Sequence, residues 1–192
     1  MPTVNDIFDW RAANGSITIA GSDDTFDPNY YAGQSREEGF STGDLLRLHG
    51  AGMNIVMNSW NSGYAFERGI AGRVTFSGIE QIYGSAGNDT LRAGAITEAL
   101  DGWRGVSFFG GAGNDNATGS RFADFFDPGD GNDIIWAGLG DDHIDASRGN
   151  DTIHGGGGGD NIRWGGGNSG SLAPGDDVLV GGEGHDLVNL WA

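Results

Sequence analysis

The feature that most restricts the fold of this chain is a nine-residue repeat that runs without a gap from residue 128 to residue 163. The stretch divides into four units, which begin at Pro128, Ala137, Ala146 and Gly155. In every unit the fourth residue is Gly, the sixth is Asp and the eighth is Ile. This is the nonapeptide G-G-x-G-x-D-x-U-x, where U is a large aliphatic residue, and such a period predicts coils stacked one on the next.

The same pattern extends to both sides of this stretch. A complete unit spans 84–92, and after an interruption at 93–109 the repeat starts again. A short unit at 164–171 has eight residues and no aspartate. The sixth-place aspartates of the whole array are Asp89, Asp115, Asp124, Asp133, Asp142, Asp151, Asp160, Asp177 and Asp186.

Residues 1–83 lack this regularity, but they contain short apolar segments about ten residues apart, separated by Gly, Asn and Ser. That spacing favours short stacked strands over helices. We therefore predict an all-β fold: a parallel β-roll (a β-solenoid) over 84–192 with a loop insertion at 93–109, and an irregular β-rich cap over 1–83. The cap could be a separate domain or irregular coils of the same solenoid.

Each unit divides into a six-residue turn and a three-residue strand. Glycines at the second and fourth places permit positive φ, and Asn or Asp at the fifth place also tolerates left-handed conformations. Such a turn can direct its carbonyl groups towards one point, and the sixth-place aspartate adds a carboxylate. Oxygen ligands of this kind suit Ca²⁺, whereas the lack of His or Cys at these places disfavours a transition metal.

Two units make one coil of 18 residues, so aspartates 18 apart should stack along the same edge of the roll. One edge would carry Asp115, Asp133 and Asp151, and the other Asp124, Asp142, Asp160 and, after the short unit, Asp177. An ion between two stacked turns would be held by an aspartate from each, which predicts roughly four to six Ca²⁺ ions.

The U residues should point inward from two sheets and form a core one side chain thick. They are Phe126, Ile135, Ile144, Ile153, Ile162, Leu179 and Val188. Each buried side chain contributes about 1.5–3 kcal/mol, but every ordered residue costs about 1–2 kcal/mol of backbone entropy. Stacked carboxylates also repel one another, so we expect metal binding to be coupled to folding.

The composition narrows the possible partners. The chain has 27 acidic and 10 basic residues and a net charge of −17, which disfavours binding to nucleic acid. It has no cysteine, so disulfides and thiolate zinc sites are excluded. No apolar run is long enough for a transmembrane helix, and residues 1–10 do not have the pattern of a Sec-type signal peptide. We expect a monomer.

Together the units at 84–92 and 110–189 resemble the RTX (repeats-in-toxin) family of hemolysin-type calcium-binding proteins, and Phe76–Ile82 is similar to the segment that leads into RTX arrays. The resemblance implies a right-handed parallel β-roll, export by a type I system, and folding outside the cell. It implies as ligands the nine sixth-place aspartates and the carbonyls of Gly111, Gly113, Gly129, Gly131, Gly138, Gly140, Gly149, Gly156, Gly158, Gly182 and Gly184. Ser120 and Ala123 depart from the pattern near Asp124, as does Ser147 before Asp151, and 164–171 should lack a full site.

Outward residues are the other candidates for function. Trp136 and His154 should be stacked neighbours on one face, and Asp145 and Arg163 should be neighbours on the other. Trp136, with Ile134, could be covered by the N-terminal region or by 93–109. Alternatively, Trp136, Trp164 and nearby acidic residues could form a sugar-binding surface.

The sequence thus predicts a calcium-binding module that supports the folding of an extracellular protein. Two alternatives are a module that binds polysaccharide or a cell surface, and part of a polysaccharide-modifying enzyme. No catalytic constellation stands out in the sequence, so an enzyme is the less favoured of these interpretations.

Overall fold

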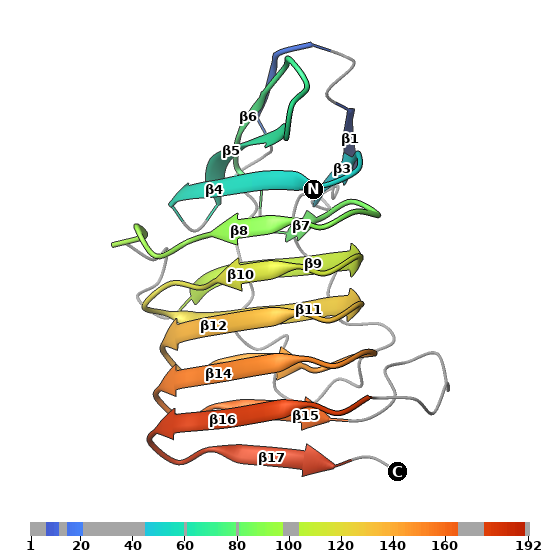
Figure 1. Ribbon diagram of the computed structural model, residues 1–192. Helices are drawn as coiled ribbons and strands as arrows, with labels where there is room; N and C mark the ends of the chain where they lie inside the picture. The colour runs from blue at the N-terminus through green and yellow to red at the C-terminus, as the bar shows by residue number, and fades with distance from the viewer. Residues whose placement is uncertain are drawn as a thin grey trace.

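The computed structural model describes residues 7–11, 15–20, 45–59, 61–79, 81–97, 104–164 and 175–190, and in these ranges the chain is all β (Figure 1). One sheet, here called sheet A, has eight strands: β1 (Ile7–Arg11), β3 (Leu45–His49), β7 (Gln81–Tyr83), β9 (Arg104–Ala112), β11 (Ala123–Asp130), β13 (His143–Asp145), β15 (Asn161–Trp164) and β17 (Leu187–Leu190). Sheet B has nine, in the order β16 (Val178–Glu183), β14 (Thr152–Gly157), β12 (Ile134–Leu139), β10 (Asn116–Thr118), β8 (Thr90–Arg92), β4 (Met53–Ser59), β5 (Ser62–Glu67), β6 (Val74–Ser77) and β2 (Ile17–Ala20). In the described residues, no helix is long and apolar enough to cross a membrane.

From β7 onwards the chain alternates between the two sheets, and each strand pairs in parallel with the strand one coil later. Asn116 pairs with Ile134, and Ile134 with Thr152, so the register advances by 18 residues, as the repeat predicts. The coils lie one below another down the molecule (Figure 1). The predicted parallel β-roll is therefore confirmed.

Inward side chains from both sheets form one continuous core. Of the predicted core residues, Phe126, Ile135, Ile144, Ile153 and Ile162 are fully buried, and Leu179 is half-buried. Val188 in the last coil is 43% exposed. Strand alternation explains the pattern, because every second residue of a strand faces the same side of its sheet.

The N-terminal strands extend the same two sheets. β3 pairs with β7 and β4 pairs with β8, both in parallel, while β4, β5 and β6 are joined by antiparallel pairing. Larger side chains fill this part of the core, among them Trp10, Met53 and Phe76. The division of the chain at residue 83 stays a prediction, but no break in the sheets marks it.

The interruption at 93–109 differs from the prediction of a loop. Its second half belongs to β9, which pairs with β7 and β11. Val106 and Phe108 are buried at alternate positions, which is what a strand with one face on the core requires. Residues 98–103 lie outside the described part of the chain.

Candidate metal centre

The turns have the backbone conformation that their glycines predict. All eleven predicted glycines of the second and fourth places have positive φ, for example 109° at Gly111 and 155° at Gly131. A Cβ built on Gly131 would lie 1.8 Å from the carbonyl oxygen of Gly113 in the coil before it. Stacking therefore excludes a side chain here as strictly as the φ angle does. Ser147 is the one described non-glycine with positive φ, at 49°.

The fifth-place residues have a different role from the one predicted. None of them has positive φ. Instead the side chain of Asn114 accepts the backbone N–H of Asn132 at 3.0 Å, and Asn132 accepts that of Asn150 at 2.8 Å. Asn88 and Asn150 extend this asparagine ladder to Asn114 and Asp176. The ladder ties successive coils together at the exposed rim of the turns.

The sixth-place aspartates form two further ladders, in which the backbone N–H of each donates to Oδ1 of the aspartate one coil later. The predicted pairs are confirmed: Asp133 donates to Asp151 at 2.9 Å, and Asp142 donates to Asp160 at 3.0 Å. The first ladder runs through Asp89, Asp115, Asp133, Asp151 and Asp177. The second runs through Asp124, Asp142, Asp160 and Asp186.

The predicted position of Asp177 is therefore wrong. It follows Asp151 in the first ladder and does not belong to the edge of Asp160. β14 pairs directly with β16, so the step from Asp151 to Asp177 is 26 residues in place of 18. Trp164 Nε1 donates to Asp177 Oδ2. Residues 165–174, on which the prediction of an incomplete site falls, lie outside the described residues.

Five of these carboxylates have an oxygen that is buried without a hydrogen-bond partner. The orphaned atoms are Oδ2 of Asp115, Asp133, Asp142, Asp151 and Asp160. All five residues are at most 2% exposed. A buried carboxylate oxygen without a hydrogen-bond donor destabilises the fold. We call the five turns that carry these oxygens open turns, and a cation would contribute most to stability there.

Two turns are closed by serine, a feature that the sequence analysis missed. Ser85 donates its backbone N–H to Asp89 Oδ2 at 2.5 Å and its hydroxyl to Oδ1 at 2.8 Å. Ser120 does the same for Asp124, at 2.6 and 2.9 Å. These closed turns begin the two ladders. The sequence does contain a signal for these two turns, because Ser85 and Ser120 occupy the second place of their units.

Burial raises the pKa values of the seven ladder aspartates from Asp89 to Asp160 when no cation is bound. Loss of water is the largest cause in each case, and it raises the pKa of Asp142 to about 9 and that of Asp115 to about 8. The charges of Asp124 and Asp160 raise the pKa of Asp142 further, while the backbone N–H that it accepts acts in the opposite direction. The pKa of Asp133 is raised to about 6. The ladders thus concentrate carboxylates without a matching positive charge.

This donor set fits Ca²⁺ if backbone oxygens complete the coordination. A Cβ built on Gly110 would lie 2.2 Å from Asp115 Oδ2 and 2.4 Å from the carbonyl oxygen of Pro128, so both oxygens border the same small space. Gly155 has the same relation to Asp160 and Gly181. Within the described ranges, no three acidic, His or Cys side chains are grouped closely enough to hold a metal alone. Carboxylate and carbonyl oxygens together are the usual calcium ligands.

The two predicted pairs of outward residues are neighbours, although Asp145 is buried and does not lie at the surface. The rings of Trp136 and His154 stack with centroids 3.8 Å apart and planes 6° apart. Arg163 Nε lies 3.7 Å from Asp145 Oδ1. The prediction that other parts of the chain cover Trp136 and Ile134 is wrong, because these side chains are 51% and 40% exposed.

Comparison with known proteins agrees with the geometry of the turns. The family model of the RTX calcium-binding nonapeptide repeat matches in four copies, over residues 74–105, 109–144, 136–169 and 173–192. No curated protein and no solved structure matches the chain. The four copies cover more than half of the 192 residues and contain both aspartate ladders. The chain therefore belongs to the RTX calcium-binding nonapeptide-repeat family, and it is a calcium-binding module.

Proposed function

We propose that this module makes the folding of an exported protein depend on extracellular calcium. The observation that carries the proposal is the set of five buried carboxylate oxygens without a hydrogen-bond partner. A chain that buries these groups without a cation loses their hydration and gains nothing in return. A cation between the coils would remove that cost and the repulsion along each ladder at once.

The proposed ligands are the aspartates of the five open turns, with Asp177 and Asp186 at the ends of the ladders, and the glycine carbonyls of the second and fourth places. The five open-turn aspartates are the strongest candidates, because each offers a free Oδ2. We propose that roughly four to six ions bind, each between consecutive coils. Asp89 and Asp124 already have their oxygens bonded by Ser85 and Ser120.

The core supports the same proposal. From β10 onwards the inward residues are small or medium in size, such as Ala117, Ile135 and Ile153, with Phe126 as the largest. Glycine supplies 38 of the 192 residues, and it loses more backbone freedom on folding than any other residue. Apolar burial alone is thus a weak driving force here, and bound calcium would supply part of the folding free energy.

We also propose that the protein is exported by a type I system and acts outside the cell. RTX-repeat proteins are typically secreted, and the family match covers more than half of this chain. Folding that waits for calcium would keep such a chain unfolded until it reaches the higher calcium concentration outside.

Calcium titration followed by circular dichroism tests the proposal. The chain should gain β structure cooperatively as calcium rises, and the calcium bound per folded chain should be counted in the same samples. Magnesium is the matched control, because its small octahedral shell prefers water and does not suit a cage of protein oxygens. A chain that is fully folded in excess chelator, with no calcium retained, would contradict the proposal.

A further inference from the structure

The outer surface of sheet B differs in charge from the rest of the molecule. Strands β4, β8, β10, β12, β14 and β16 point alternate side chains outward in two registered rows. The first row contains Asn54, Thr90, Asn116, Ile134, Thr152 and Val178, and the second contains Val56, Arg92, Thr118, Trp136, His154 and Val180. These rows, with the outward residues of β5 and β6 and with Arg73 just before β6, are called the sheet B face. Neither row contains an acidic residue, although the chain has 27.

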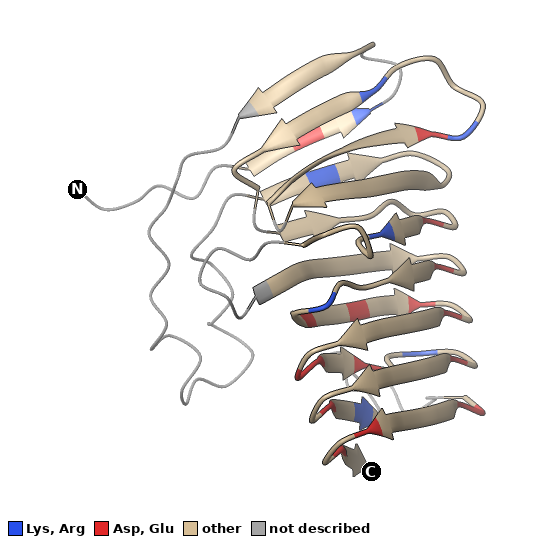
Figure 2. Cartoon of the chain, turned by 90° about the vertical axis from the view of Figure 1, so that its left-hand side faces the viewer, with Lys and Arg blue, Asp and Glu red and all other residues tan. Residues whose placement is uncertain are grey.

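The acidic residues of the roll gather elsewhere. Figure 2 shows them one above another at the turns, where the strands end. Arg92 is exposed on the sheet B face and has no ion-pair partner among the described residues. An unpaired arginine in a chain of net charge −17 is available to an anionic ligand.

Aromatic rings lie in the same row as this arginine. Trp136 is 51% exposed and stacks on His154 on one side. On its other side the row continues with Thr118, which is too short to cover the indole ring, and then with Arg92. Strands are about 4.8 Å apart, so Arg92 and Trp136 are separated by about 10 Å along the row.

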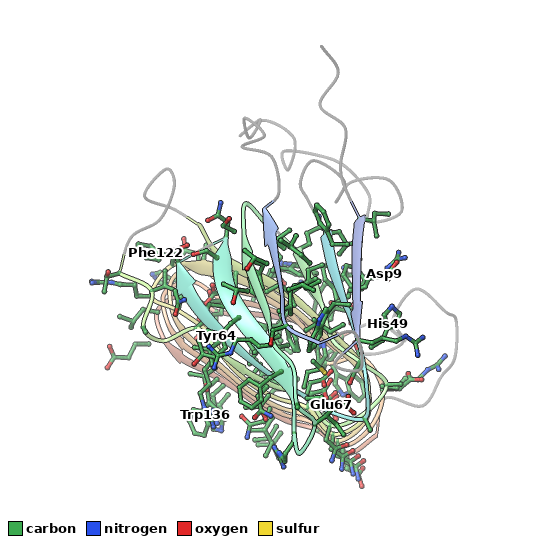
Figure 3. The ribbon with its side chains drawn as sticks, turned by 90° about the horizontal axis from the view of Figure 1, so that it is seen from above. Asp9, His49, Tyr64, Glu67, Phe122 and Trp136 are labelled. Atoms are coloured by element: carbon green, nitrogen blue, oxygen red, sulfur yellow. The ribbon has the colours of Figure 1, made fainter. Side chains whose placement is uncertain are left out.

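The row continues onto the N-terminal strands and ends at a hollow. Val56 pairs with Tyr64, and Tyr64 with Thr75. Tyr64 and Trp136 lie on the same side of the roll, and Trp136 points away from the ribbon (Figure 3). Arg73 lies over the Tyr64 ring at 4.6 Å. An open hollow of about 580 Å³ follows, lined by Ser16, Thr18, Phe66, Ile70, Arg73 and Thr75.

We propose that the sheet B face binds an acidic polysaccharide. Arg92 and Arg73 pair with carboxylates of the sugar chain, because guanidinium groups form strong charge-assisted hydrogen bonds with carboxylates. Trp136 presents a flat amphipathic ring to a sugar face, while the Tyr64 ring holds Arg73 in place. From β6 to β14 the face spans about 29 Å, which suits an extended chain better than a single small molecule.

Other occupants fit less well. Nucleic acid needs many phosphate contacts, whereas the described residues of this face carry only two arginines, beside turns lined with aspartates. A neutral glycan would not explain why acids are absent from both rows. A second copy of the chain would have to contact the arginines with its own acidic turns. Sedimentation of the unmodified chain and of Arg92→Gln distinguishes such a dimer from a polysaccharide complex.

The test uses the full chain in calcium, with folding verified by circular dichroism in every variant. The probes are an array of acidic oligosaccharides built from galacturonate, glucuronate or mannuronate, with neutral gluco- and chito-oligosaccharides beside them. We expect at least one acidic series to bind, with affinity that falls as salt is raised from 50 to 300 mM. The neutral series should not bind.

Two variants locate the site. Arg92→Gln and Trp136→Ala should each weaken binding about tenfold or more, because each removes one charged or stacking contact. Arg11→Gln is the matched control: Arg11 is also exposed, but it lies on β1 of sheet A, and its loss should leave binding unchanged.

Three results would overturn the proposal. They are no binding of any acidic oligosaccharide at millimolar concentration, equal binding of neutral ones, or an Arg92→Gln variant that binds as tightly as the unmodified chain. A dimer in sedimentation that dissociates in Arg92→Gln would assign the face to a second copy instead. Because calcium-dependent folding is measured separately, failure here leaves the proposed function untouched.

Discussion

The first turn of each aspartate ladder differs from the turns that follow it. At Asp89 and Asp124, a serine at the second place occupies both carboxylate oxygens. At the five open turns the same place holds glycine, or Ser147 with its φ of 49°, and one oxygen is left without a partner. Ser147 donates its hydroxyl to Asp127 and not to Asp151. Ser85 and Ser120, which close their turns, do not share its positive φ.

This difference suggests a division of roles along the roll. The closed turn of Asp89 lies next to β4, where Met53 donates its N–H to the carboxylate, and the closed turn of Asp124 lies next to β9, where Val106 does the same. The core beside β4 contains large side chains such as Trp10 and Leu46. The open turns lie where the core narrows to single aliphatic side chains. The N-terminal coils can thus supply a folded edge without calcium, onto which the calcium-dependent coils add one by one, as in other repeat folds.

The largest expected effect is that of pH, because it acts on all five open turns together. In the protein alone, burial raises the aspartate pKa values above the ordinary 3.8, to about 8 at Asp115 and about 9 at Asp142. The folded chain then binds more protons than the unfolded chain. The contribution of these aspartates to the free energy of unfolding is therefore greatest below pH 3.8 and falls as pH rises towards 9.

Without calcium the chain should therefore gain β structure when the pH is lowered from 8 to 5. With calcium the chain should instead have more β structure at pH 8 than at pH 5, because protons compete with the cation for the same oxygens. Circular dichroism at both pH values, in metal-stripped buffer and in millimolar calcium, measures both. A calcium-free chain with as much β structure at pH 8 as at pH 5 would contradict the assignment of the orphaned oxygens.

The next effect comes from replacing one carboxylate by its amide. Asp133→Asn keeps an acceptor for the N–H of Asp115 but weakens the cation site. It should remove about one bound calcium per chain and lower the free energy of unfolding in saturating calcium by about 3 kcal/mol. Urea unfolding and metal counting give the two values.

The matched control is Asp124→Asn in a closed turn. It disturbs bonds to Ser120 and Val106, so it should cost about 1 kcal/mol and leave the calcium count unchanged. If both variants lose the same amount of calcium, the distinction between closed and open turns has no functional meaning.

The third effect follows from opening a closed turn. Ser120→Gly removes the hydroxyl that donates to Asp124, which should cost about 1 kcal/mol at the lowest calcium concentration at which the chain is folded. At tenfold higher calcium the loss should shrink, since a cation can then take the place of the hydroxyl. Ser147→Gly is the control and should show no such dependence on calcium. Equal losses for Ser120→Gly at both concentrations would show that the hydroxyl does not substitute for a cation.

Most of this architecture could be predicted from the sequence because the repeat has a fixed period. The period placed Asp133 beside Asp151 and Trp136 beside His154, and both pairs are confirmed. It failed where the period is interrupted. The period puts Asp177 on the wrong edge and predicts a loop where β9 forms, because the length of an irregular segment does not reveal whether it forms a strand of its own.

Side-chain hydrogen bonds were harder to predict than the fold. Asn or Asp at the fifth place satisfies two different demands, a left-handed backbone or a ladder acceptor, and residue type alone does not separate them. The same holds for serine at the second place, where Ser85 and Ser147 make opposite choices. These choices depend on the neighbouring coil, which the sequence of one unit does not contain.

The smallest effect concerns the asparagine ladder, which forms the same hydrogen bond at a closed turn and at open turns. Asn132→Ala removes an acceptor for the N–H of Asn150 at an open turn, and Asn88→Ala removes one for Asn114 at a closed turn. Both bonds are exposed, so each variant should lower the free energy of unfolding by only about 0.5–1 kcal/mol. The two losses should be equal and independent of calcium, and Asn116→Ala on strand β10 provides the baseline for an exposed asparagine. Asn132→Ala could instead lower the free energy of unfolding more than Asn88→Ala, with the difference disappearing in excess calcium. That result would mean that the fifth-place residue also affects the cation site. Closed and open turns would then differ at the fifth place as well as at the second.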